Sequence, residues 1–148
     1  MTEPEIRHWL NRAFYADKKA RALEMLTEQC RERAEGLSRS QEGKDAGRQN
    51  GSQNATEAAL LRLADLERRC REQIAELVTV TDEISGAISK LHDDDLETVL
   101  IHRYVLFHTI EQTAESMHYC TETVRRKTNK AVQKLCEKVV ECGIDDVL

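Results

Sequence analysis

Residues 9–37 read WLNRAFYADKKARALEMLTEQCRERAEGL, and small or apolar residues recur in this stretch at alternating spacings of four and three. A heptad repeat of this kind keeps one face of a helix against a partner helix. The stretch therefore predicts a long helix with one packed face. The residues of that face, named the first seam, are Trp9, Ala13, Ala16, Ala20, Leu23, Thr27, Cys30, Ala34 and Leu37.

The same spacing returns in residues 63–91, and a reversal of the chain about residue 50 pairs the two stretches position for position. Leu23 then faces Leu77, and Thr27 faces Gln73 in a polar layer that specifies the register. We predict a long antiparallel helical hairpin, a coiled coil, with separate packing of each helix in a bundle as the alternative. The second seam consists of Leu63, Leu66, Cys70, Gln73, Leu77, Val80, Ile84, Ala87 and Leu91.

Residues 38–55, between the seams, read SRSQEGKDAGRQNGSQNA, where two alanines are the only apolar residues and three glycines disfavour a helix. Such a segment has almost nothing to bury, so we predict a flexible loop that trypsin cuts at Arg39, Lys44 or Arg48. Residues 1–92 would form the hairpin, with this loop at 38–55. Residues 93–148, where the helical patterns become shorter, would form a second domain.

Further apolar residues lie beside the seams and need another surface to cover them. Either the C-terminal segment docks on them or a second copy of the chain does. The second outcome predicts a homodimer, most simply with two-fold symmetry. These residues are Ile6, Leu10 and Phe14 in the first helix and Ile74, Val78 and Ile88 in the second.

The composition of the 148 residues predicts an all-α fold class, because one Pro and 4% aromatic residues disfavour an all-β fold. No apolar run exceeds four residues, and the N-terminus is acidic. We therefore expect neither a membrane span nor a secretory signal. The five cysteines are odd in number and widely spaced, and we expect them to be reduced thiols in the cytoplasm.

Residues 94–140 contain three shorter helical patterns. The second begins at Thr109, which can form a capping box with Gln112, and ends near Met117. The third begins near Thr121. Two helices joined by so short a turn form the skeleton of a helix-turn-helix. The third pattern directs Val124, Ala131, Val132 and Leu135 inward.

These residues resemble region four of bacterial sigma factors, and the whole chain is similar to a small phage- or prophage-associated family described as sigma-factor-like. The resemblance implies a transcription regulator that binds promoter DNA and can also contact RNA polymerase. His118 stands where that family usually has Gly in a left-handed conformation. The matching runs are His102–Leu106, Thr109–Gln112, Ala114–Met117, Thr121–Arg125 and Lys130–Leu135.

Charge supports DNA binding independently of the resemblance. The net charge of the chain is −5, yet six basic residues between Arg125 and Lys138 stand against the single acid Glu137. A cationic helix face can neutralise DNA phosphates, and the alternative is a solvated helix surface. We expect base contacts from Thr121, Glu122, Arg125 and Arg126, and phosphate contacts from Asn129, Lys130 and Lys134.

Other functions are disfavoured by what the sequence lacks. It contains no glycine-rich phosphate loop and no nucleophile elbow, so we do not expect an enzyme. The acidic run at residues 93–95 fits the start of a helix better than a metal cluster. His118, Cys120, Cys136 and Cys142 lack the paired spacing of zinc sites, so we expect no metal and no other cofactor. The main alternative to DNA binding is a coiled-coil adaptor or assembly protein whose helix-turn-helix contacts only protein.

Overall fold

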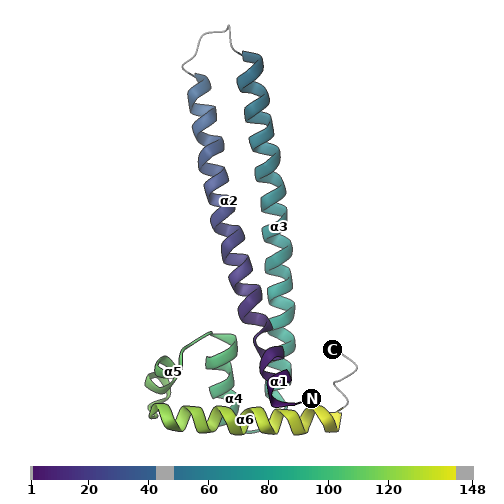
Figure 1. Ribbon diagram of the computed structural model, residues 1–148, viewed down its shortest axis with the longest axis vertical. Coiled ribbons are helices and arrows are strands. Elements are labelled where there is room, and N and C mark those ends of the chain that lie inside the picture. The colour runs from purple at the N-terminus through teal and green to yellow at the C-terminus, as the bar shows by residue number, and fades with distance from the viewer. Residues whose placement is uncertain (1, 43–48, 143–148) are drawn as a thin grey trace. The chain divides into compact units, whose positions relative to one another are not determined.

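The computed structural model describes residues 2–42 and 49–142, with the side chains of residues 2–37 and 54–140. Every regular element in these residues is helical, as the composition predicts (Figure 1). None of the described helices is long and apolar enough to cross a membrane. The elements are α1 (Glu3–Leu10), α2 (Arg12–Glu42), α3 (Gln49–Ser89), α4 (Asp94–Leu100), the π-helix η2 (Ile101–Val105), α5 (Ile110–Met117) and α6 (Thr121–Cys142).

The chain divides into two compact units. The arm consists of residues 17–76, and the core unit consists of residues 1–16 and 77–148. This division differs from the predicted boundary between residues 92 and 93. The reason is that α1, the first turn of α2 and the end of α3 share one apolar core with the C-terminal helices.

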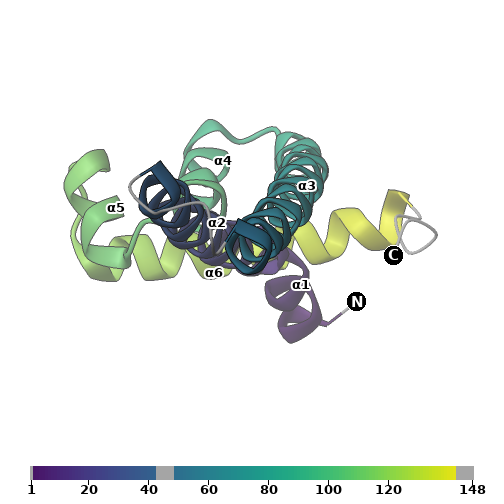
Figure 2. The same cartoon turned by 90° about the horizontal axis from the view of Figure 1, so that it is seen from above.

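In the arm, the segments of α2 and α3 lie side by side in both views (Figures 1 and 2). The polar layer is buried, with Thr27 6% and Gln73 7% exposed. Thr27 Oγ1 lies 3.1 Å from Cys70 Sγ, and Arg31, further along α2, donates to Glu67, earlier in α3, over 3.1 Å. The two segments are therefore antiparallel, as predicted. Coiled-coil packing in the strict sense stays a prediction.

The predicted loop at residues 38–55 is wrong in its extent. Helix α2 continues to Glu42 and α3 begins at Gln49, so helix covers both flanks of that segment. Arg, Gln, Glu and Ala in these flanks favour helices, and extending an existing helix is far easier than starting one. Two of the predicted trypsin sites, Lys44 and Arg48, lie outside the described residues.

The core unit has one apolar core to which segments far apart in the sequence contribute. Ile6, Leu10 and Ile88 are at most 1% exposed, and they share this core with residues of α4 and α6. The C-terminal segment, one of the two predicted coverings, therefore covers these three residues. Ile74 is 40% and Val78 54% exposed, so the C-terminal segment does not cover these two residues, and the homodimer stays a prediction. The largest core side chains include Ile6, Leu10, Ile84, Ile88, Leu100 and Leu135.

Two helix breaks were not predicted. The helix expected over residues 9–37 is interrupted at Asn11, where the side chain of Arg12 donates to the Trp9 carbonyl over 3.3 Å. After α4, the Leu106 amide donates to the Ile101 carbonyl, five residues earlier, over 2.9 Å. This hydrogen bond defines the π-helix η2, whose wider turn holds one residue more than an α-helical turn.

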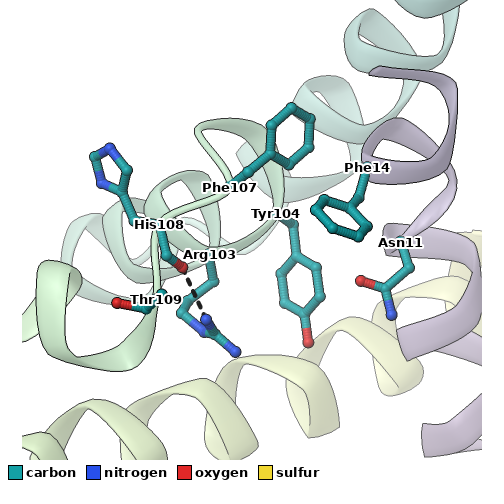
Figure 3. A pocket seen from close by; sticks show the side chains of 7 residues that line it. All are labelled: Asn11, Phe14, Arg103, Tyr104, Phe107, His108 and Thr109. Carbon is teal, nitrogen blue, oxygen red and sulfur yellow. Dashed lines mark hydrogen bonds between the residues drawn. The ribbon is translucent and has the colours of Figure 1, made fainter. Parts of the chain in front are cut away.

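The turn between η2 and α5 is stabilised by packing and by one charged hydrogen bond (Figure 3). Phe107 has a φ of 58°, a conformation that strains an aromatic residue. Its ring lies edge-on to Phe14, with 5.7 Å between the ring centroids. Arg103 donates to the His108 carbonyl over 2.8 Å. These contacts offset the backbone strain and set the point at which α5 begins.

Helix α5 begins and ends, and helix α6 begins, where the sequence predicts. The Thr109 hydroxyl accepts from the Gln112 amide over 3.1 Å, and the Gln112 side chain accepts from the Thr109 amide over 2.9 Å, which confirms the capping box. His118 ends α5 in the left-handed conformation, with φ 58° and ψ 39°. Residues 118–120 then connect α5 to α6, which begins at Thr121.

Candidate nucleic-acid interface

Helix α6 has a buried face and an exposed face. Val124, Ala131, Val132 and Leu135 are at most 1% exposed, as predicted. All the predicted DNA-contact residues belong to α6, and only Lys134 among them is half-buried. The predicted set therefore lies on one helix, outside its buried face.

The first turns of α6 carry Thr121, Glu122 and Arg125, all of them exposed. The side chain of Arg125 is 57% exposed, and its Nη1 lies 3.8 Å from Glu122 Oε2. An exposed pair at this distance contributes little free energy, so Arg125 can exchange Glu122 for another acceptor at small cost. Its paired N–H groups match the O6 and N7 acceptors of guanine.

Arg126, Lys127 and Lys130 line a groove of about 430 Å³. The N-terminal turn of α4 contributes Asp93 and Asp95 to the same groove, so its charge is mixed. Lys127 pairs with Asp95, whereas Arg126 and Lys130 make no ion pair within residues 2–37 and 54–140. Arg126 and Lys130 are thus the cations of the groove without an acidic partner among the described residues.

The α4 acids engage two other lysines of α6. Lys127 Nζ donates to Asp95 Oδ2 over 2.7 Å and lies 4.8 Å from the centroid of the Tyr119 ring. The hydrogen bond from Lys127 lowers the pKa of Asp95, and the same bond raises the pKa of Lys127. Lys134 Nζ lies 3.8 Å from Asp93 Oδ2. Asp93 therefore offsets part of the Lys134 charge, and the phosphate contact of Lys134 stays a prediction.

The acidic run was predicted to mark the start of a helix, and that role is confirmed. The side chain of Asp93 accepts from the Leu96 amide over 3.3 Å and caps α4. The contacts of Asp93 and Asp95 with α6 were not predicted. Periodicity within one helix carries no information on which distant segment packs against it, so these contacts could not be predicted from the sequence.

Asn129 is hydrogen-bonded by a residue that sequence analysis did not single out. Arg7 Nη2, on α1, donates to Asn129 Oδ1 over 2.6 Å. Arg7 Nη1 also donates to the Tyr104 hydroxyl, over 3.4 Å. Because 122 positions separate Arg7 from Asn129, no local motif could reveal the contact. The structure thus shows that a residue of α1 lies beside the exposed face of α6.

A second cavity, of about 190 Å³, lies beside η2 (Figure 3). Its volume is below the roughly 300–1,000 Å³ typical of small-molecule sites. Next to it, His102 Nδ1 lies 3.0 Å from His108 Nδ1, so one ring donates and the other accepts. We interpret this pair as part of the turn rather than as a reactive site. The cavity is lined by Asn11, Phe14, Arg103, Tyr104, Phe107, His108 and Thr109.

Of the residues weighed for a metal site, Cys120 has another side-chain partner. In the described part of the chain, no group of three or more His, Cys, Asp or Glu side chains could hold an ion. Cys120 Sγ lies 3.0 Å from Thr123 Oγ1 at the start of α6, and this hydrogen bond lowers the pKa of the Cys120 thiol. Burial raises the pKa of the Cys136 thiol. The side chain of Cys142 lies outside the described residues.

The candidate interface therefore combines exposed cations of α6, acids of α4 and one arginine of α1. Guanidinium and ammonium groups bind phosphates and the acceptor edges of bases, so such a surface is chemically suited to a polyanion. Comparison with known proteins adds no assignment, because no family model, no curated protein and no solved structure matches this chain.

Proposed function

We propose that this protein binds duplex DNA and acts as a sigma-factor-like transcription regulator. In this proposal, α5, residues 118–120 and α6 form a helix-turn-helix, and the first turns of α6 lie in the major groove. The observation that supports it best is the pair Arg126 and Lys130, exposed on α6 and without an acidic partner in the described residues, in a chain whose net charge is −5.

The first experiment selects a preferred site from random duplex DNA and measures affinity by fluorescence anisotropy over a range of salt concentrations. Arg125→Ala should weaken binding to the selected site by about 1–3 kcal/mol and relax the preference at one base pair, because Arg125 is proposed to bind a guanine. Arg33→Ala is the matched control. It removes the same charge from an exposed residue of the arm and should bind like the parent.

Lys130 tests the phosphate contacts. Lys130→Ala should weaken binding to all sequences alike and reduce the dependence of log K on log salt by roughly one unit. Lys134→Ala should have a smaller effect, since Asp93 already offsets part of the Lys134 charge.

Asp93 offers a test by gain of affinity. Asp93→Asn keeps a side chain that can cap α4 and removes the carboxylate beside Lys134. Binding to all duplexes should become stronger, and its salt dependence should become steeper. Asp94→Asn is the control, because Asp94 is exposed, has the same charge and makes no ion pair with a described residue. Equal gains in the two variants would mean that the Asp93–Lys134 pair has no special role.

The proposed function fails if selection recovers no preferred sequence and if Arg125→Ala and Lys130→Ala bind DNA as the parent does. The basic face of α6 would then be a solvated helix surface. In that outcome the alternative is a coiled-coil adaptor whose α5–α6 region contacts protein only, with RNA polymerase as the first partner to test by co-sedimentation.

A further inference from the structure

The contact between α1 and α6 fixes the orientation of one side chain at the proposed interface. Arg7 Nη2 donates to Asn129 Oδ1 over 2.6 Å. A guanidinium has donors only, so the oxygen of the Asn129 amide, and not its nitrogen, must face Arg7. The Nδ2 group of Asn129 is then left to donate elsewhere. Asn129 is exposed and Arg7 is half-buried, so both remain accessible to solvent.

The charge of Arg7 is also available at this position. Its two hydrogen bonds go to neutral acceptors, the amide of Asn129 and the hydroxyl of Tyr104. Arg7 makes no ion pair with any residue in the described ranges. A guanidinium has five N–H donors, of which these contacts use two. Arg7 thus holds a positive charge without an ion pair, and unused donors, next to the Asn129 amide.

We propose that Arg7 and Asn129 together bind one backbone phosphate of the DNA, an inference that rests on the proposed function. Asn129 donates to the phosphate through Nδ2, and Arg7 donates through its unused N–H groups. Bonds from a charged donor to a phosphate oxygen are among the stronger hydrogen bonds in proteins. The site makes α1 part of the DNA-binding surface and adds a contact outside the helix-turn-helix.

The geometry favours a phosphate over a base edge. An asparagine that recognises adenine uses its oxygen and its nitrogen together. In this structure Arg7 already occupies the Asn129 oxygen, so the pair offers donors and positive charge. Donors without an acceptor suit the phosphate oxygens, which are present at every step of the duplex. We therefore expect this site to raise affinity for all sequences and to leave base preference unchanged.

The test uses the full chain, the selected duplex and a random duplex, with anisotropy measured over a range of salt concentrations. Arg7→Gln keeps a hydrogen-bond donor for Asn129 and removes the charge. It should weaken binding to both duplexes by the same factor and reduce the salt dependence by roughly one unit. Arg7→Lys should restore the parental salt dependence. A purely structural role of Arg7 would not link the salt dependence to charge in this way, and thermal unfolding of each variant checks the fold.

Asn129 provides the second arm of the test. Asn129→Asp should bind both duplexes more weakly than Asn129→Ala, because it places a carboxylate where the phosphate is proposed to bind. The inference is overturned if Arg7→Gln keeps the parental salt dependence while Lys130→Ala lowers it, a result that leaves the proposed function standing. If the parent binds no duplex, the proposed function fails and this inference fails with it.

Discussion

The arm and the core unit consist of the same secondary structure but bury different residues. In the core unit the buried side chains are mainly large and aliphatic, such as Leu100 and Leu135, which are at most 1% exposed. In the arm they are mainly small or polar, such as Thr27, Ala34 and Cys70. Apolar area removed from water supplies most of the free energy of folding. The comparison therefore indicates that the arm is the less stable unit and opens before the core unit.

The largest expected effect is in the core unit. Leu135→Ala should lower the free energy of unfolding by about 2–5 kcal/mol, because it leaves a cavity at a position that is 1% exposed. Urea titration followed by Trp9 fluorescence reports on this unit, since Trp9 belongs to its core. Leu61→Ala in the arm, at a side chain 72% exposed, is the control and should change little. Similar losses in both variants would contradict the contrast between the units.

The polar layer of the arm should give a smaller effect of opposite sign. Thr27 Oγ1 donates to the Leu23 carbonyl over 2.6 Å in a buried position. A polar seam residue specifies register at a cost in stability, so Thr27→Val, which puts an apolar side chain of similar shape in the seam, should stabilise the arm by about 1 kcal/mol. Hydrogen exchange of the arm amides should slow about fivefold in consequence.

Thr98 supplies the matched control for this substitution. Its hydroxyl donates to the Asp94 carbonyl over 2.6 Å, with the same four-residue spacing, but Thr98 is exposed and belongs to the core unit. Thr98→Val should therefore leave exchange nearly unchanged. Faster exchange in Thr27→Val would mean that the polar layer stabilises the arm.

Ion pairs on the arm should contribute less again. Arg31 pairs with Glu28 at 2.6 Å and with Glu67 at 3.1 Å, and its side chain is 41% exposed. Arg31→Ala should destabilise the arm slightly at low salt, and the loss should shrink at high salt because ions screen exposed pairs. Arg33→Ala, at an exposed arginine without an ion pair in the described residues, is the control. A loss that is unchanged at 1 M salt would assign the effect to packing.

The cysteines allow both units to be probed in one measurement, in a Cys142→Ser background. Cys120 should react fastest with a thiol reagent at neutral pH, because it is exposed and its lowered pKa increases the thiolate fraction. Thr123→Val removes a hydrogen bond that lowers this pKa, so the pKa should rise and the reaction should slow. Cys30 and Cys70 are buried in the arm and should react only as the arm opens. Reaction of these two at the rate of Cys120 would show that their burial does not persist in solution.

The parts of the fold that local chemistry determines could be predicted from the sequence. The heptad spacing identified most of the buried face of the arm, including the polar pair Thr27 and Gln73, although the predicted seam residue Leu37 is 37% exposed. The Thr109 capping box placed the start of α5, and the inward positions of α6 followed from its period. Each of these features depends on residues within a few positions of one another, or on a repeat that continues over many turns.

The remaining features depend on contacts between distant segments. The turn of the π-helix η2 holds one residue more than an α-helical turn, and no local sequence signal predicts this residue. Tyr104 in η2 is buried in a core to which several helices contribute. Arg7 and Asp95 contact α6 from 122 and 32 positions away, respectively. The exposed cations of the candidate interface were thus predictable from α6 alone. The acids that α4 contributes, Asp93 and Asp95, and the arginine of α1, Arg7, were not.

The composition of the core unit has a consequence for how the protein is made. A ribosome releases residues 1–16 long before residues 77–148, although both segments belong to one unit. Ile6 and Leu10 therefore emerge without the helices that later bury them, and α1 must wait through the synthesis of the entire arm. A nascent chain cannot display the α1–α6 surface until α6 has been synthesised, so this surface forms only after the whole arm has emerged.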